Sequence, residues 1–165
     1  MNAGPHGGKT PALSPWLSLV LWVALCLGVG ALGGFFTADA VRLWYPSLHK
    51  PSWNPPAWLF GPVWTALYVM MAVAAHRIGR CACRRMPLAL FLVQLAFNAA
   101  WSPVFFGAHL IGAALAVLAA LWLTLAATTV VFYRRDALAG ALLVPYLAWC
   151  TFAAALNFAI WRLNA

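Results

Sequence analysis

Aromatic side chains recur at helical spacing in one apolar stretch of this 165-residue chain. Phe60, Trp64 and Tyr68 stand four residues apart, so a helix would place their rings on one face. Rings on one face can stack against a flat apolar ligand, and an offset-stacked pair contributes about 0.5–1.5 kcal/mol beyond the area that it buries. These residues therefore suggest recognition of a ligand by stacking.

Uncharged amides follow the same spacing in two later stretches. Gln94 and Asn98 are four residues apart, and the same interval separates the members of the set Trp149, Ala153 and Asn157. The small side chain of Ala153 would leave room for a flat ring beside Trp149. The amides could hydrogen-bond a ligand in a pocket, or they could join neighbouring helices in a packing role. Spacing alone does not decide between these two interpretations.

Conventional catalytic and metal sites are not indicated. The two acidic residues, Asp39 and Asp136, lie at the borders of apolar stretches, and no acid–base or nucleophile–base pair is visible. Cys81 and Cys83 follow His76, but their spacing is poor for zinc, and arginines surround them. A cationic loop beside anionic lipid headgroups is the better interpretation of this segment.

The composition places these residues in a membrane. Hydrophobic residues make up 65% of the chain and charged residues 7%, whereas a soluble domain carries about 25% charged residues. Ten Lys/Arg and two Asp/Glu give a net charge of +8. Such a chain cannot cover a soluble surface, which excludes an ordinary cytosolic enzyme, a disordered chain and a nucleic-acid-binding domain. The remaining class is an integral membrane protein.

Uncharged runs predict an all-α protein with a bundle of five transmembrane helices. A helix needs about 20 apolar residues to cross a bilayer. The run 86–133 would be about 72 Å long as one helix, so it must fold back near Pro103–Gly112. We expect helices over about 15–36, 57–78, 87–105, 110–133 and 138–162. They would form a single domain, 15–165, after a disordered Gly/Pro-rich tail, 1–14.

The cations predict how these helices are oriented. The tail, the second loop and the fourth loop hold seven Lys/Arg, and the opposite side holds Arg42, Lys50 and Arg162. By the positive-inside rule the N-terminus is cytoplasmic and the C-terminus lies outside. The excess of Arg over Lys fits a bacterial source, so we expect the protein in a bacterial cell membrane.

The predicted loop of residues 37–57 is rich in proline and tryptophan. Its prolines fix the backbone and remove hydrogen-bond donors, so the loop is expected to be rigid. Its aromatic residues could form a belt at the membrane surface. Alternatively, a loop that is both stiff and aromatic could close over a ligand.

Several motifs occur in order along the chain. They are Trp44-Tyr45, LHKPSWNPP (48–56), WTALY (64–68), QLAFNAAWSPVFFG (94–107), PYLAW (145–149) and LNFAIWRLN (156–164). In this order and spacing they resemble the TspO/MBR family, which comprises translocator proteins, tryptophan-rich sensory proteins and relatives of the peripheral benzodiazepine receptor. The resemblance covers nearly the whole chain from residue 40 onward.

The resemblance implies a membrane receptor or transport protein that binds tetrapyrroles, such as protoporphyrin IX or haem, among its helices. Its role would be sensory, regulatory or porphyrin transport, with no other cofactor and commonly as a homodimer. The positions that match the family's pocket are Tyr45, Trp53, Phe60, Trp64, Tyr68, Gln94, Asn98, Trp149, Ala153 and Asn157. Arg42 or Lys50 could meet propionates. Haem iron would need an axial ligand, and His49 is the one histidine near this pocket. Because the family pattern does not require histidine at that position, a tetrapyrrole without iron ligation is favoured.

Two alternative functions remain within this resemblance. The first is a light-dependent enzyme that degrades porphyrin and relies on its tryptophans. The second is binding and translocation of a sterol or lipid. The family's sterol segment corresponds to Leu156, Phe158 and Arg162, with Phe158 in the place of its central tyrosine.

Small residues at four-residue spacing favour close helix packing in two places. Gly30 and Gly34 form a GxxxG pair, and a second stripe comprises Gly112, Ala116, Ala120, Thr124 and Thr128. Such stripes let helices approach closely, either within one chain or between two copies of a homodimer.

Overall fold

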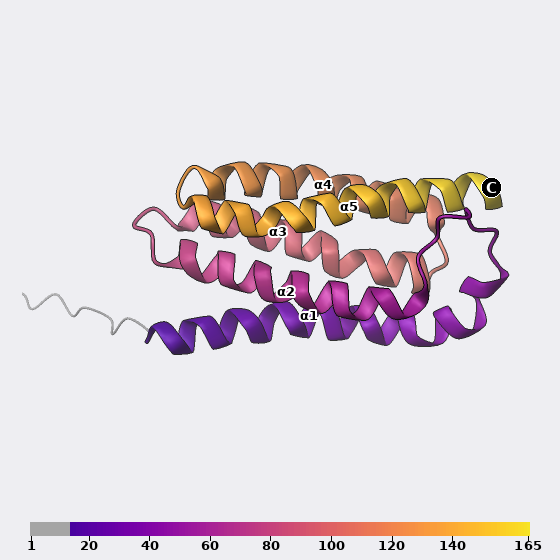
Figure 1. Ribbon diagram of the computed structural model, residues 1–165, viewed down its shortest axis with the longest axis horizontal. Coiled ribbons are helices and arrows are strands. Elements are labelled where there is room, and N and C mark those ends of the chain that lie inside the picture. Colours follow the sequence, from indigo (N-terminus) through magenta and orange to yellow (C-terminus); the bar gives the residue numbers. More distant parts are fainter. Residues whose placement is uncertain (1–13) are drawn as a thin grey trace, which may run out of the picture.

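The computed structural model describes residues 14–165, and five long helices form a bundle in that range (Figure 1). They are α1 (Pro15–Leu43), α2 (Ala57–Gly79), α3 (Arg85–Ser102), α4 (Ile111–Tyr133) and α5 (Ala137–Asn164). Each helix, with α3 taken together with the turn that follows it, is long and apolar enough to cross a bilayer. The predicted all-α, five-helix membrane fold is confirmed. The tail predicted to be disordered, 1–14, lies outside the described residues apart from Ser14.

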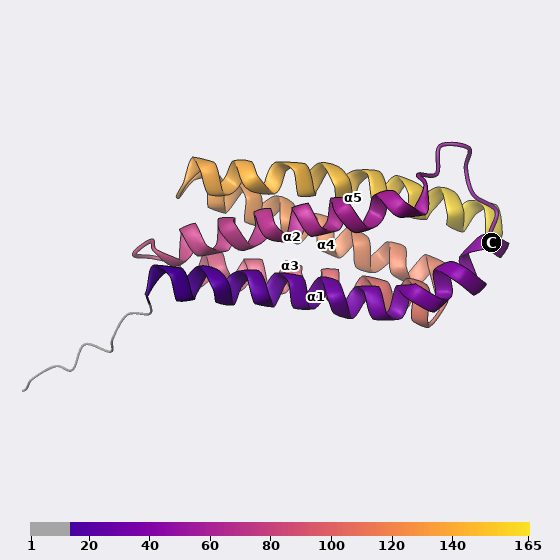
Figure 2. The same ribbon diagram turned by 60° about the horizontal axis from the view of Figure 1, so that its bottom comes forward.

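The two ends of the bundle carry different connections. One end holds the start of α1 and the turns α2–α3 and α4–α5, at the left of Figure 1. The other end holds the first loop (residues 44–56), the turn from α3 to α4 and the C-terminus. Figure 2 shows this loop beside the last turns of α5. Along the bundle, α5 packs against α2 and α4, and α1 packs against α2 and α3.

α1 is longer than the sequence predicted. It begins where Ser14 Oγ accepts a hydrogen bond from the Leu17 amide at 3.2 Å, and it ends at Leu43 rather than near residue 36. The expected end rested on the first charged residues, but a charge does not interrupt helical hydrogen bonding. The α-helix ends shortly before Pro46, where a 3₁₀ turn, η1 (Tyr45–Ser47), begins the first loop.

The predicted fold-back lies between residues 103 and 110. A π-helical turn, η2 (Pro103–Gly107), continues α3, and the Ala108 amide donates to the Pro103 carbonyl at 2.8 Å. His109 then adopts a left-handed conformation with φ 58°. Its imidazole stacks on the indole of Trp44, with 4.0 Å between ring centroids. This contact fastens the α3–α4 turn to the first loop.

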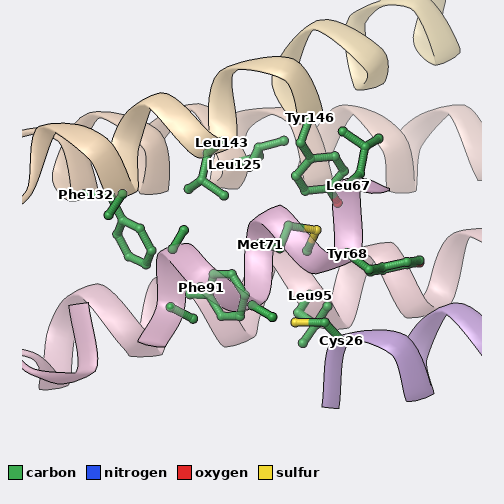
Figure 3. Packing of buried hydrophobic residues seen from close by; sticks show 14 of the residues in the cluster. Cys26, Leu67, Tyr68, Met71, Phe91, Leu95, Leu125, Phe132, Leu143 and Tyr146 are labelled. Carbon is green, nitrogen blue, oxygen red and sulfur yellow. The ribbon is translucent and has the colours of Figure 1, made fainter. Parts of the chain in front are cut away.

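Large apolar side chains fill the interior between the helices (Figure 3). Phe91 of α3 stacks on Phe132 of α4 with 6.0 Å between centroids, and Met71 and Tyr146 are fully buried. Because lipid is as apolar as these side chains, close packing rather than exclusion of water holds such helices together. The main cluster lies toward the end that carries the α2–α3 turn, and it leaves the other half of the bundle for the site described next.

Candidate ligand-binding site

A cavity of about 680 Å³ lies among the helices in the half of the bundle next to the first loop. Small-molecule sites typically have volumes of about 300–1,000 Å³ and apolar linings with a few polar groups. This lining follows that pattern. Its aromatic members are Tyr45, Phe60, Trp64, Tyr68, Trp101, Phe105, Phe106, Trp149 and Phe152.

Eight of the ten residues indicated by the family resemblance line the cavity. They are Tyr45, Phe60, Trp64, Tyr68, Asn98, Trp149, Ala153 and Asn157. Trp53 lies outside the cavity: it packs edge-on against Phe152 at 5.8 Å, and 48% of its surface is exposed. Gln94 also lies outside the lining. It is fully buried, and neither of its amide atoms has a hydrogen-bond partner within residues 14–165.

Perpendicular rings form one wall of the cavity. Trp64 of α2 and Trp149 of α5 meet at 87° with 6.5 Å between centroids. Tyr68 stacks on Trp64 at 5.5 Å, and Phe60 meets the edge of Trp149 at 5.9 Å. Each ring is held by the next, so the faces that line the cavity are fixed before any ligand arrives.

The buried amide of Asn98 joins three helices at this wall. Tyr68 of α2 donates its hydroxyl hydrogen to Asn98 Oδ1 at 2.7 Å, and Asn98 Nδ2 donates to the hydroxyl of Tyr146 on α5 at 2.8 Å. Asn98 therefore has the packing role that the sequence offered, because it bonds neighbouring helices, and its side chain also lines the cavity.

Asn157 has the same double role near the α3–α4 turn. Its Oδ1 accepts from Trp101 Nε1 at 3.2 Å, and its Nδ2 donates to the carbonyl of Ile111 at 3.0 Å. Both polar ends of the amide are satisfied by protein, while the side chain lines the cavity. Asn157 thus holds α5 to the end of α3 and to the start of α4.

One wall of the cavity comes from α1, on which the sequence indicated only Arg42, as a possible partner of a propionate. Small side chains provide most of this wall, namely Gly30, Ala31, Gly33, Gly34 and Ala38. A methyl group on Gly30 would lie 2.5 Å from the ring of Tyr68, so glycine is required there for the close approach of the two helices. The GxxxG pair was the available signal. Gly30 packs within the chain against Tyr68, whereas a methyl group on Gly34 would meet nothing within 4 Å.

The first loop covers the cavity and is held by internal hydrogen bonds. Tyr45 donates to Asn54 Oδ1 at 2.7 Å, and burial raises the pKa of Tyr45 to about 12, so its phenol remains a donor. Lys50 Nζ donates to the carbonyls of Tyr45 and Leu48, both at 2.8 Å. These bonds join residues two to nine positions apart within the loop.

The end of α5 fastens the loop from the other side. Asn164 Oδ1 accepts from the His49 amide at 2.9 Å, and Asn164 Nδ2 donates to the His49 carbonyl at 2.9 Å. A side-chain amide thereby pairs with the backbone of a residue 115 positions away. The loop is held in place over the cavity by this pair and by the stack of Trp44 on His109.

Five membrane-length helices around an aromatic cavity define a multi-pass membrane protein with a cavity of ligand size. The chain belongs to the TspO/MBR family, whose sequence profile matches residues 22–162, and this membership supports a membrane receptor or transport role. It is 43% identical over 149 residues to the tryptophan-rich sensory protein of Cereibacter sphaeroides, covering 90% of this chain and 92% of that protein. It is 41% identical over 156 residues to the human translocator protein, covering 91% and 92% of the two chains. Protein CrtK of Rhodobacter capsulatus is 44% identical over 156 residues, with 92% and 95% covered.

Proposed function

We propose that the cavity binds a tetrapyrrole, with protoporphyrin IX as the reference ligand, in a sensory, regulatory or porphyrin-transport role. The observation that carries the proposal is the pair of perpendicular rings, Trp64 and Trp149, in the cavity wall. One ring can stack on the face of a flat plate while the other meets its edge, and both arrangements are favoured by aromatic quadrupoles. The cavity volume of about 680 Å³ supports a ligand of this class.

Arg42 is the candidate partner for a ligand carboxylate. It is the one cationic side chain among the lining residues in the described part of the chain. A guanidinium can hold a carboxylate through two parallel hydrogen bonds. Lys50 is less suited to this role, because its ammonium group already donates to carbonyls of the first loop.

The lining favours an iron-free tetrapyrrole over haem. Haem iron takes His, Cys, Met or Tyr as axial ligand, and the only lining residues of these types within 14–165 are Tyr45 and Tyr68. The raised pKa of Tyr45, about 12 because of burial, opposes formation of the phenolate that iron would bind. His49 is not among the lining residues.

Titration of the full chain in detergent with protoporphyrin IX, followed by the porphyrin absorption band, tests the proposal. Trp64→Ala and Trp149→Ala each remove one stacking ring. Stacking of that ring contributes about 1.5 kcal/mol or less beyond the area that it buries, and the loss of buried area adds to this. We therefore expect each variant to bind protoporphyrin IX about tenfold or more weakly. Trp58→Ala is the matched control on α2, because the Trp58 side chain is 72% exposed and does not line the cavity. Equal affinities in all three variants would show that the porphyrin binds elsewhere.

Light-dependent degradation of the porphyrin is a second candidate, favoured by the position of Trp64 and Trp149 in the cavity wall. The test is loss of the porphyrin absorption band under illumination, compared with a dark sample and with Trp64→Phe and Trp149→Phe proteins. Loss that is equal with free porphyrin and with the complex would exclude a role of the protein.

Sterol binding is the third candidate, and the predicted sterol segment does not converge on one place. Leu156 lines the cavity, whereas Phe158 and Arg162 are exposed on α5. A sterol in the cavity would displace protoporphyrin IX, while a sterol on the outer face of α5 would leave porphyrin affinity unchanged. A competition titration therefore distinguishes the two locations.

We propose further that the N-terminus is cytoplasmic, in a bacterial cell membrane, and that the protein forms a homodimer. The arginine-rich α2–α3 turn supports this orientation by the positive-inside rule. Cys83 in that turn is exposed, so a membrane-impermeant maleimide should label it only in opened cells. Light scattering of the detergent-solubilised protein measures whether two copies associate.

A further inference from the structure

The end of the bundle opposite the cavity carries a group of cations that ligand binding does not use. Four arginines lie between the last turn of α2 and the first residue of α3, and two lie in the α4–α5 turn. The exposed members are Arg80, Arg84, Arg85, Arg134 and Arg135. We call these five residues the arginine cluster.

The single acidic side chain at this end is already occupied. Asp136 accepts from Arg77 Nη2 at 2.7 Å and Nε at 2.8 Å, and it also caps α5 by accepting from the amides of Leu138 and Ala139. The other acidic residue of the described chain, Asp39, lies near the C-terminal end of α1, at the opposite end of the bundle. The arginine cluster therefore has no acidic partner within residues 14–165.

The two turns that carry the cluster are held together. Arg135 Nη1 donates to the carbonyl of Cys83 at 3.5 Å, and the Arg77–Asp136 ion pair joins the last turn of α2 to the α4–α5 turn. The sequential pairs Arg84–Arg85 and Arg134–Arg135, far apart in sequence, are thereby kept at one end of the bundle (Figure 1). α3 also begins at Arg85 without a side-chain cap, so its helix dipole adds positive potential there.

We propose that the arginine cluster binds the headgroup of an anionic phospholipid that carries two phosphates. The cluster lies at the ends of membrane-spanning helices, which is the depth of lipid headgroups. A guanidinium binds a phosphate through paired hydrogen bonds, and each pair of adjacent arginines can take one phosphate. Basic sites of this kind between helix ends bind diphosphate lipids in other membrane proteins.

Native mass spectrometry of the full chain in detergent measures this binding. The probes are tetraoleoyl cardiolipin with two phosphates, dioleoylphosphatidylglycerol with one, dioleoylphosphatidylcholine with no net charge, and inorganic pyrophosphate as a free anion. We expect cardiolipin to bind about tenfold more tightly than phosphatidylglycerol. We expect phosphatidylcholine to bind weakest, and 0.5 M salt to weaken the binding of both anionic lipids.

Arg84→Gln and Arg134→Gln each remove one cation from a different pair. Each is expected to weaken cardiolipin binding about fivefold, as for one charge near a membrane surface. Arg162→Gln is the matched control, because it removes an exposed arginine at the opposite end. An unchanged unfolding temperature and an unchanged circular dichroism spectrum show that the variants are folded.

Three results would overturn the proposal. The first is equal affinity for cardiolipin and phosphatidylglycerol. The second is that Arg162→Gln weakens cardiolipin binding as much as the two cluster variants do. The third is displacement of cardiolipin by an equimolar amount of pyrophosphate. The last result would identify a site for free anions instead of a lipid headgroup. None of these outcomes depends on whether the cavity binds a tetrapyrrole.

Discussion

Replacing Gly30 by alanine tests how α1 shapes the cavity. The added methyl group would lie 2.5 Å from Cε2 and 2.8 Å from Cδ2 of Tyr68. The ring cannot swing aside freely, because its hydroxyl donates to Asn98 at 2.7 Å and its face stacks on Trp64. Gly34 lies one turn further along α1 and also lines the cavity, but a methyl group there would meet nothing within 4 Å. Gly34→Ala is therefore the matched control.

The comparison between the two variants isolates the clash. Both substitutions gain the helix propensity of alanine over glycine, about 1 kcal/mol, so this term cancels. Overpacking of the Tyr68 ring costs about 1–3 kcal/mol, and loss of its hydrogen bond to Asn98 costs about 1 kcal/mol. We expect Gly30→Ala to be less stable than Gly34→Ala by about 2–4 kcal/mol. It should also bind protoporphyrin IX more weakly, since Tyr68 is displaced.

The assay is reversible unfolding in mixed micelles with increasing sodium dodecyl sulfate, followed by circular dichroism. The same pair of variants is measured in a Tyr68→Ala background, which removes the ring and forms a double-mutant cycle. The reasoning predicts that the difference between Gly30→Ala and Gly34→Ala disappears in that background. Equal stabilities in the native background, or a difference that persists without the ring, would refute it.

Three further substitutions test other contacts. Gly140→Ala should lower the unfolding free energy by about 1–3 kcal/mol relative to Gly34→Ala, because its methyl group would lie 2.5 Å from Cα of Tyr133. Burial alone would raise the pKa of Asp136, but its hydrogen bonds with arginine and backbone amides hold it below the ordinary 3.8. The ionised carboxylate therefore stabilises the fold above pH 3.8. Asp136→Asn should cost about 0.2–1 kcal/mol at pH 7, and this difference from the native protein should vanish as pH falls through the lowered pKa; a difference that is constant with pH would contradict it. Asn164→Ala should free the first loop, seen as faster proteolysis within residues 44–56 at little cost in unfolding temperature, and an unchanged cleavage rate would argue against the clamp.

Hydropathy identified the five helices because the cost of placing charges and unpaired backbone groups in lipid leaves few options for a chain this apolar. Helix ends were less well predicted. α1 extends past Asp39 to Leu43, since charged residues leave the hydrocarbon without ending the helix. The turn between α3 and α4 also uses a π-helical segment and a left-handed His109, neither of which has a reliable sequence signal.

The cavity lining was predictable where side chains carry distinctive chemistry. Helical periodicity gives the direction of a side chain around its own helix, and it placed Phe60, Trp64 and Tyr68 on one face, which the structure turns toward the cavity. It does not give the depth of the cavity along the bundle. Gln94 shares its spacing with Asn98 but lies beyond the lining, in the packed core.

The amino-acid sequence by itself determined the membrane class, the number of spans, the family and the helix faces that carry rings and amides. Each of these follows from composition, spacing and ordered motifs, which are properties of segments. Only the tertiary structure decided that the glycines of α1 form a cavity wall, that Lys50 is occupied by loop carbonyls while Arg42 lines the cavity, and that two distant turns gather the arginine cluster. These features depend on which helices meet and at what depth, and that is set by packing between segments distant in the chain.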